Sequence, residues 1–414
     1  EAHQTVSRWF EKIQIERQQS LYKMLIEKVN VVGATCIGIN TKALFKDLDF
    51  DIVIVDESGQ IQIHNLIVPL SRAQKVILVG DHKQLPPVVS NEVLDEVTER
   101  GFEDAEDMYR LSWFEHLWNE TPSDRKVMLD EQFRCPSLIS DYVSKTFYGG
   151  KYFAGAGTGP EDKKPQFSFC PSPMIFIDTS KDNNRHEKSR NTEGRAEVLD
   201  NILETKIVIA LLRRCLKERP ELAVNNEIGI IVPYANHVKA IQNQIRQLQK
   251  RGEFKELNTP LNELVASVDS FQGQERDLII FPFSRSNKYG KVGFLSDWRR
   301  LNVAQTRAKK QLIMIGDLST LAKKPRNPEA RDAEFKEAIK QLKEFCQSHG
   351  SLLSSNIFVH HPKKDTAQNG RFNRMGKVEE KNRYRSSKQS KNKSSNSKAM
   401  NKTATKQKKD IVDE

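Results

Sequence analysis

The stretch FDIVIVDESGQIQ, residues 50–62, places two adjacent carboxylates directly after a run of apolar residues. Residues 52–55 are all apolar and β-branched, which is typical of a strand buried on both faces of a parallel sheet. Asp56 and Glu57 follow this strand. Ligand sites in parallel sheets lie beyond the carboxyl ends of the strands. The pair therefore predicts a site that holds a metal ion and activates a water molecule.

Apolar runs of this kind recur along the chain and predict an α/β fold. We expect further strands at residues 29–35, 75–81, 126–131, 174–179, 228–234, 277–283 and 311–317. Apolar residues at helical spacing predict helices at residues 8–28, 193–219, 236–251 and 329–348. Strands that alternate with helices indicate parallel sheets with helices on both faces. This number of strands exceeds one sheet, so we expect two α/β domains that meet near residues 119–125.

The composition argues against a secreted or membrane protein. No apolar run approaches the ~20 residues that a membrane span needs, and no signal peptide is recognisable. The five cysteines never occur as CxxC pairs, which favours a reducing compartment and argues against a zinc module. We therefore expect a cytoplasmic or nuclear protein without a membrane partner.

The positive charge is concentrated at the C-terminus. Residues 363–414 contain 16 Lys or Arg and 6 Asp or Glu, so this tail carries +10 of the formal net charge of +11. It is rich in Lys, Ser, Asn and Gln and poor in apolar residues, which predicts disorder. The tail could bind nucleic acid or protein partners, act as a localisation signal, or only increase solubility.

Further polar residues follow other predicted strands. Asp81 and Gln84 lie in GDHKQLPPVV, residues 80–89, while Gln132 and Arg134 lie in LDEQFRCP. Later segments add Glu275, Arg300 and Arg307. Phosphoryl transfer depends on positioning and charge neutralisation, to which carboxylates, glutamines and arginine forks are suited. The pattern therefore predicts phosphoryl chemistry at the ends of the strands.

With these motifs the sequence resembles the UPF-like (superfamily 1B) RNA and DNA helicases, the group of the nonsense-mediated decay helicase and senataxin. The match runs from residues 31–38 to residues 313–317, with motifs in the order and spacing of the family. The resemblance implies two RecA-like P-loop NTPase domains with parallel sheets, of which the first is incomplete in this chain. It also implies an ATP- and Mg²⁺-dependent helicase or translocase that moves 5′ to 3′ on single-stranded RNA or DNA. A monomer is expected.

For the nucleotide, the resemblance implies a role for each matching residue. Asp56 resembles the magnesium-associated carboxylate, Glu57 the base that orients water, and Gln84 the γ-phosphate sensor. The remaining roles fall to Gln132 and Arg134 of the QxR element, Phe133 as the aromatic residue that stacks on the base, Glu275 as the ribose contact and Arg307 as the arginine finger. Arg134 and Arg300 could instead form salt bridges between domains.

For the nucleic acid, the resemblance implies contacts from Thr35, Pro233, Tyr234 and Ser267 to the backbone or bases. Sequence-tolerant contacts of this kind suit a motor that steps along any strand. Tyr234 could instead belong to the core, and Thr35 could form a turn.

The sequence departs from the family pattern at two places. Ser58 stands where alanine is commoner, which we expect to be silent. The glycine-rich loop GxxxxGK[ST] and the adenine-recognition glutamine are not found in residues 1–49 and are expected N-terminal to residue 1. Because that loop supplies much of the phosphate affinity, the chain alone is expected to be deficient in hydrolysis.

The sequence thus predicts four parts. Residues 1–121 belong to the first RecA-like domain, 122–325 form the second, 326–362 contain a C-terminal helix and 363–414 form the basic tail. The alternative to a helicase is a non-enzymatic module that binds nucleic acid or protein, and a helicase fused to a nuclease is a third possibility.

Overall fold

The computed structural model describes residues 2–26, 28–41, 45, 48–89, 91–100, 112–190, 198–324 and 330–358. All of them belong to one unit, residues 1–361, and the basic tail lies outside the described residues. The elements up to residue 125 are α1 (Ala2–Ile26), α2 (Gly38–Thr41), β1 (Phe50–Val55), η2 (Ser58–Gln60), α3 (Ile63–Leu70), β2 (Ala73–Leu78), α4 (Asn91–Glu99), α6 (Trp113–Glu120) and η3 (Ser123–Arg125). The later elements are β3 (Glu131–Gln132), α7 (Ser137–Phe147), β4 (Phe153–Ala154), β5 (Met174–Asp178), β6 (Lys188–Arg190), β7 (Val198–Asp200), α8 (Ile202–Glu218), α9 (Glu221–Val224), β8 (Ile228–Ile231), α10 (Ala235–Lys250), α11 (Leu261–Leu264), β9 (Val265–Ala266), η4 (Asp269–Phe271), β10 (Arg276–Pro282), η5 (Gly293–Ser296), α12 (Arg299–Gln305), β11 (Ala308–Gly316), α13 (Leu318–Leu321), α14 (Ala330–Ser348), β12 (Leu352–Ser354) and η6 (Ser355–Ile357).

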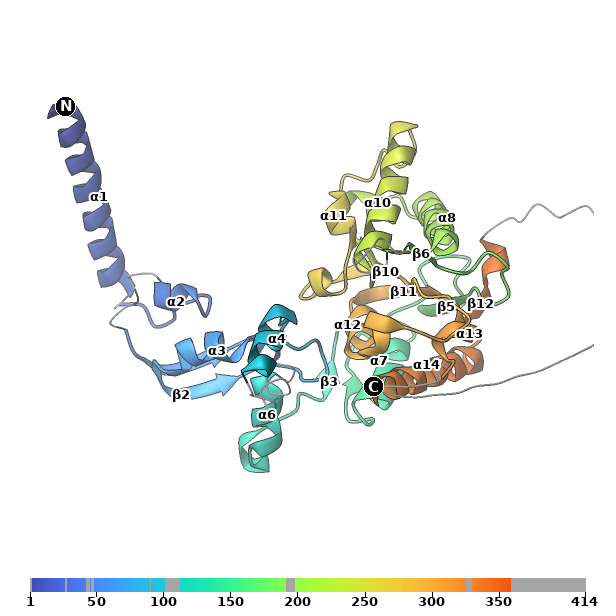
Figure 1. The fold of residues 1–414 in the computed structure, drawn as a ribbon, viewed down its shortest axis with the longest axis horizontal. Coiled ribbons are helices and arrows are strands. Elements are labelled where there is room, and N and C mark those ends of the chain that lie inside the picture. Colours follow the sequence, from blue (N-terminus) through green and yellow to red (C-terminus); the bar gives the residue numbers. More distant parts are fainter. Residues whose placement is uncertain are drawn as a thin grey trace, which may run out of the picture. The chain divides into compact units, whose positions relative to one another are not determined.

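A six-stranded parallel sheet forms the centre of the second half of the chain (Figure 1). Its strand order is β12-β5-β11-β10-β8-β9, and all of these pairs are parallel. Successive residues of β11 alternate between two apolar clusters, with Met314 in one and Ile313 and Ile315 in the other. The strand is therefore buried on both faces, as its unbroken apolar run predicts.

Helices cover both faces of this sheet (Figure 1). α7 and α14 pack against the cluster that contains Met314, whereas α8 and α10 pack against the other cluster. The predicted helix at 329–348 is confirmed as α14, whose Phe335, Ile339 and Leu342 are buried in the core. The predicted α/β class with parallel sheets is thereby confirmed.

The first half of the chain contributes a smaller parallel pair, β1 and β2. The expectation that β1 is buried on both faces is wrong, because Ile52 is 51% and Ile54 is 65% exposed. Among the described residues, no third strand pairs with β1 or β2. Apolar side chains of both strands, such as Ile54 and Ile77, therefore contact solvent.

Two other predicted strands are also wrong. Residues 29–35 have no strand, and of residues 126–131 only the last belongs to a strand, β3. Val127 is 80% and Leu129 is 81% exposed, so both lack the cross-strand neighbours that stabilise a strand. The helix at 8–28 is present as α1, but its apolar residues Trp9 and Met24 are exposed rather than packed on a common core.

No helix in the part of the chain that the structure describes is both long and apolar enough to span a bilayer.

Candidate nucleotide and nucleic-acid site

The turn after β1 positions the two adjacent carboxylates. Glu57 has a left-handed backbone (φ 51°), and its backbone N–H donates to Asp56 Oδ1 at 2.9 Å. Gln60 Nε2 donates to Glu57 Oε2 at 2.6 Å. Both carboxylate residues are exposed, which leaves them accessible to a ligand.

Ser58 ties this turn to the end of the neighbouring strand. It is fully buried, and its Oγ donates to the carbonyl oxygen of Val79 at 2.7 Å. A Cβ on Gly80 would lie 2.8 Å from Ser58 Oγ and 2.9 Å from Gly59 N, so only glycine fits there. The hydroxyl of Ser58 therefore links the two strand ends by a hydrogen bond that alanine could not make.

The loop after β2 is held by the carboxylate of Asp81. Asp81 Oδ1 accepts from the backbone N–H of Lys83, and Oδ2 accepts from Gln84 Nε2, both at 2.9 Å. Tyr148, directly after α7, donates its hydroxyl to Asp81 Oδ2 at 2.6 Å. Asn302 on α12 donates from Nδ2 to the carbonyl oxygen of Lys83 at 2.8 Å. The loop is thus bound to two helices that lie far from it in the sequence.

Arg307 lies against this loop and is only 3% exposed. Its Nη2 donates to Gln84 Oε1 at 2.9 Å, and its Nε donates to the carbonyl oxygen of Val303 at 3.2 Å. Burial lowers the pKa of Arg307 to about 10, and the positive charge of Arg134 acts in the same direction. The carboxylates of Glu57 and Glu275 partly oppose this shift. The guanidinium remains charged at neutral pH, and the charges of three other predicted site residues act on its pKa.

The segment after β3 carries the QxR element. Gln132 Oε1 accepts from the backbone N–H groups of Arg134 and Cys135, each at 3.0 Å, while its Nε2 donates to the carbonyl oxygen of Cys135 at 3.0 Å. The amide of Gln132 thus shapes its own loop. Arg134 Nε lies 2.5 Å from Glu275 Oε2. The ring of Phe133 is 61% exposed and lies so close to Gly155 that a Cβ there would be 2.4 Å from the ring.

A cavity of about 1300 Å³ brings most of the predicted nucleotide residues together. Its lining includes Gln84, Phe133, Arg134 and Glu275. Apolar and aromatic side chains such as Trp118 line another part of it. The cavity therefore combines an aromatic surface with arginine and carboxylate groups.

Asp56 lies at a second cavity, of about 830 Å³, which Thr35 also lines. Among the described residues, no group of three or more His, Cys, Asp or Glu is arranged to hold a metal ion. Magnesium usually keeps several waters and binds one or two carboxylates together with substrate phosphates. The single exposed carboxylate of Asp56 therefore fits a magnesium ion that arrives with a nucleotide.

Three of the four predicted nucleic-acid residues lie beyond neighbouring strands of the large sheet. Pro233 and Tyr234 follow β8, Ser267 follows β9, and these two strands pair in parallel. Pro233 is buried, and the hydroxyl of Tyr234 donates to the carbonyl oxygen of Val292 at 2.5 Å. Ser267 Oγ lies 2.8 Å from Ser270 Oγ. Thr35 is elsewhere, where its Oγ1 accepts from the backbone N–H of Gly38 at 3.0 Å, as a turn former would.

The arginines of α12 differ in their partners. Arg300 pairs with Asp297 at 3.3 Å, three residues away, so this contact is local. Arg299 instead pairs with Glu115 on α6 at 3.1 Å and donates from Nε to the carbonyl oxygen of His82 at 3.2 Å. Arg299 therefore links α12 to the first half of the chain, and sequence reasoning missed it because Arg299 and Arg300 are adjacent and chemically identical.

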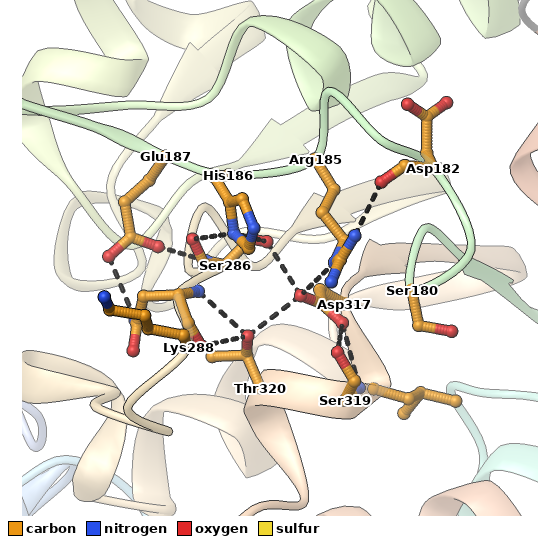
Figure 2. Close-up of polar contacts among 12 residues, drawn as sticks. Ser180, Asp182, Arg185, His186, Glu187, Ser286, Lys288, Asp317, Ser319 and Thr320 are labelled. Atoms are coloured by element: carbon orange, nitrogen blue, oxygen red, sulfur yellow. Dashed lines mark hydrogen bonds and ion pairs between the residues drawn. The ribbon is translucent and has the colours of Figure 1, made fainter.

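A polar cluster beyond β5, β10 and β11 was also missed (Figure 2). Asp317, which is fully buried, accepts through Oδ2 from Ser286 Oγ at 2.7 Å, Thr320 Oγ1 at 2.8 Å and Arg185 Nε at 3.2 Å. Burial alone raises the pKa of Asp317, but hydrogen bonds from hydroxyl groups outweigh it, and the net direction is downward. Glu187 pairs with Arg285 at 3.1 Å. The cluster anchors the segment that leads from β10 into η5 and α12.

A family described as an AAA domain matches residues 109–319, and a second AAA domain family matches residues 1–92. The chain is 31% identical over 313 residues to the probable helicase MAGATAMA 3 of Arabidopsis thaliana, covering 74% of this chain and 35% of that protein. It is 34% identical over 317 residues to the DNA replication ATP-dependent helicase/nuclease DNA2 of Xenopus laevis, covering 70% and 27%.

The ATP-dependent helicase NAM7 of Saccharomyces cerevisiae is 34% identical over 307 residues, covering 72% of this chain and 28% of that helicase. The chain thus spans only about a quarter to a third of the length of these curated relatives. The first family match extends over half of the chain, and the relatives include UPF-like and senataxin-like helicases. The chain therefore belongs to the AAA-domain family and, within it, to the UPF-like and senataxin-like group of superfamily 1 helicases.

Proposed function

We propose that the whole protein, meaning the full product of the gene that contains this chain, is an ATP-dependent helicase or translocase. It moves 5′ to 3′ along single-stranded RNA or DNA. The observation that carries this proposal is the bond between Arg307 and Gln84, which joins an arginine and a glutamine 223 positions apart at the edge of the site. Arg134 and Glu275 form an ion pair, and the charges of both act on the pKa of Arg307.

In this proposal each group acts where charge develops on the transferred phosphoryl group. Glu57 orients the attacking water. Its exposed carboxylate accepts from Gln60 through Oε2, and among the described residues no hydrogen bond engages its other oxygen. Arg134 and Arg307 neutralise the γ-phosphate, and Gln84 senses its presence. Asp56 would hold a magnesium ion, which supplies charge neutralisation at the phosphate oxygens.

The remaining assignments concern the base, the ribose and the strand. Phe133 offers an exposed ring on which a base can stack, and Glu275 has a carboxylate suited to ribose hydroxyl groups. Tyr234 and Ser267 lie past adjacent strands and would follow a single strand along that edge, where Pro233 is buried beneath the surface. Residues 1–121 and 122–325 would act as the two halves that open and close around each ATP.

Nucleic-acid-stimulated phosphate release by the whole protein tests this function. Glu57→Gln keeps the size of the side chain but removes the base, so we expect hydrolysis to be abolished while ATP binding remains. Asp51→Asn, which changes an exposed carboxylate on β1, the strand before Glu57, is the matched control and should keep normal turnover.

The 414-residue chain assayed in parallel should release phosphate poorly or not at all. Strand binding without any turnover in the wild-type whole protein would favour a non-enzymatic module. Normal turnover in Glu57→Gln would show that Glu57 is not the base.

A further inference from the structure

Four hydrogen bonds link five side chains around the loop after β2, and the backbone of α12 closes them into a ring. Asn302 Nδ2 donates to the hydroxyl oxygen of Tyr148 at 2.9 Å, and Tyr148 donates to Asp81 Oδ2 at 2.6 Å. Gln84 donates to the same carboxylate oxygen at 2.9 Å and accepts from Arg307 Nη2 at 2.9 Å. Asn302 lies on α12, and Arg307 follows this helix and donates from Nε to the carbonyl oxygen of Val303 on it at 3.2 Å, which closes the ring.

The ring decides which way the amide of Gln84 points. Its NH₂ group donates to Asp81, so its carbonyl oxygen must face Arg307. A carboxylate only accepts hydrogen bonds, so Asp81 cannot bond to Gln84 if the amide turns over. Asp81 in turn is oriented by Tyr148, whose hydroxyl is the donor that reaches it from outside its own loop in this ring.

The position of Tyr148 is itself well defined. It caps α7, and its ring meets that of Tyr152 edge to face, with centroids 5.0 Å apart. Burial raises the pKa of Tyr148, and the nearby carboxylate of Asp81 raises it further, so the hydroxyl keeps its proton and remains a donor. Asn302, which is 1% exposed, fixes the hydroxyl from the other side.

We propose that Tyr148 is a positioning residue for ATP hydrolysis, which acts through Asp81 to hold Gln84 and Arg307 in register. This inference rests on the proposed function. Tyr148 lines the same cavity as Gln84, but its hydroxyl bonds to Asp81 and Asn302, so its role is to position other groups. Closure of the ring couples the two ends of the site, because the glutamine and the arginine cannot be reoriented independently while Tyr148 holds Asp81.

The test is steady-state ATPase kinetics of the whole protein with saturating single-stranded nucleic acid. Tyr148→Phe keeps the ring and removes the hydroxyl, so we expect kcat to fall by about 10- to 100-fold, the scale of a small misplacement of catalytic groups. The KM for ATP and the affinity for the strand should change by less than about threefold, because the hydroxyl that is removed bonds to Asp81 and Asn302 and not to either ligand. Tyr152→Phe is the control, because it removes a hydroxyl from the adjoining ring, which lines the same cavity. Within the described residues this hydroxyl makes no hydrogen bond to Asp81 or Gln84, so kcat should stay within about twofold.

A double-mutant cycle separates this role from a structural one. If Tyr148 acts through Gln84, then adding Tyr148→Phe to Gln84→Ala should cost little beyond Gln84→Ala alone. Asp81→Asn keeps a single acceptor oxygen. It cannot accept from the backbone N–H of Lys83 on one side and from Tyr148 and Gln84 on the other, so it should reproduce the loss seen in Tyr148→Phe. Independent losses in the cycle, or a kcat loss that only follows a lowered melting temperature, would overturn the inference.

The outcomes also separate this inference from the proposed function. A wild-type protein that hydrolyses ATP, a dead Glu57→Gln variant and an unchanged Tyr148→Phe variant would overturn the role of Tyr148 alone. An active Glu57→Gln variant would instead contradict the assigned chemistry, whatever Tyr148→Phe does.

Discussion

Arg134 and Glu275 form an ion pair in which Arg134 Nε lies 2.5 Å from Glu275 Oε2, and both side chains remain partly exposed. The two residues are 141 positions apart in the sequence and were assigned to different parts of the nucleotide. In the structure the carboxylate of Glu275 neutralises the guanidinium of Arg134. A nucleotide that uses both residues must therefore separate the pair or share it.

Glu275→Gln tests whether this pair competes with the nucleotide. Removing the carboxylate frees the guanidinium of Arg134, so inorganic tripolyphosphate should bind about two- to fivefold more tightly, as expected for a partly exposed ion pair. ATP should gain less or lose affinity, because its ribose loses the carboxylate contact. Isothermal titration of both ligands to the whole protein measures the difference.

Glu263→Gln removes an exposed carboxylate on α11 and serves as the control for net charge. Equal shifts for ATP and tripolyphosphate in Glu275→Gln would contradict a ribose contact. No shift for tripolyphosphate would contradict competition for Arg134.

His237 gives the chain a predicted sensitivity to acid. Its ring is fully buried, with Nδ1 2.6 Å from Ser284 Oγ and Nε2 3.1 Å from Thr205 Oγ1, and burial lowers its pKa to about 3. The folded state thus binds fewer protons than the unfolded state between the two pKa values. The free energy of unfolding contributed by His237 is fully present above about pH 6.5 and is lost as the pH falls toward 3.

Urea unfolding of the 414-residue chain at several pH values measures this effect. His237→Asn should lower stability at pH 7.5 but reduce its dependence on pH between about 6.5 and 4, by up to about 1 kcal/mol per pH unit. His64→Gln, which changes an exposed histidine on α3, should leave the slope unchanged. An identical slope in His237→Asn and the wild type would show that His237 titrates normally in the folded protein.

The long apolar runs that form β5, β8, β10 and β11 could be predicted as strands from the sequence. Each of these strands pairs with another strand on both sides in the large sheet. The runs at 29–35 and 126–131 have similar composition, yet they lack partners, and hydrogen bonding between strands cannot be deduced from one strand alone. Apolar composition therefore indicated strand propensity, while pairing determined which runs became strands.

The site was predicted only in part from strand ends. Gln84 follows β2 and Arg134 follows β3, as the sequence pattern predicts, whereas Glu275 and Arg307 directly precede β10 and β11. The bond between Arg307 and Gln84 and the pair between Arg134 and Glu275 bring the two sets together. The role of Gln132 within its own loop and the ring through Tyr148 could not be deduced. Both depend on side-chain directions and on contacts between residues that are distant in sequence, such as Asp81 and Tyr148.

The basic tail offers a separate prediction. Residues 363–414 hold nearly all of the net positive charge, and binding to nucleic acid releases counterions in proportion to the phosphates neutralised. Deleting these residues should weaken strand binding and flatten the dependence of log K on log salt concentration. Fluorescence anisotropy with a labelled single strand at several salt concentrations measures both, and an unchanged slope would leave the tail only a role in solubility or targeting.

Arg307 provides the sharpest test of the catalytic assignment. It bonds to Gln84 rather than to an acidic side chain, which argues against a purely structural ion pair. The neighbouring Lys309 and Lys310 pair with Asp277 at 3.4 and 2.7 Å, so their charges are already compensated at the start of β11. Arg307 is thus set apart from the lysines that follow it in the sequence.

If Arg307 meets the γ-phosphate in the transition state, Arg307→Ala in the whole protein should lower kcat on the order of 10³-fold or more. Affinity for a single strand without nucleotide should remain within a few-fold, because no phosphate of the strand is contacted. Arg307→Lys should rescue little, since an ammonium lacks the planar fork that reaches two acceptors at once. Arg246→Ala, on the exposed face of α10, controls for the loss of a positive charge. Turnover that falls only in proportion to strand binding, or to the melting temperature, would assign Arg307 to the strand groove or to the core instead.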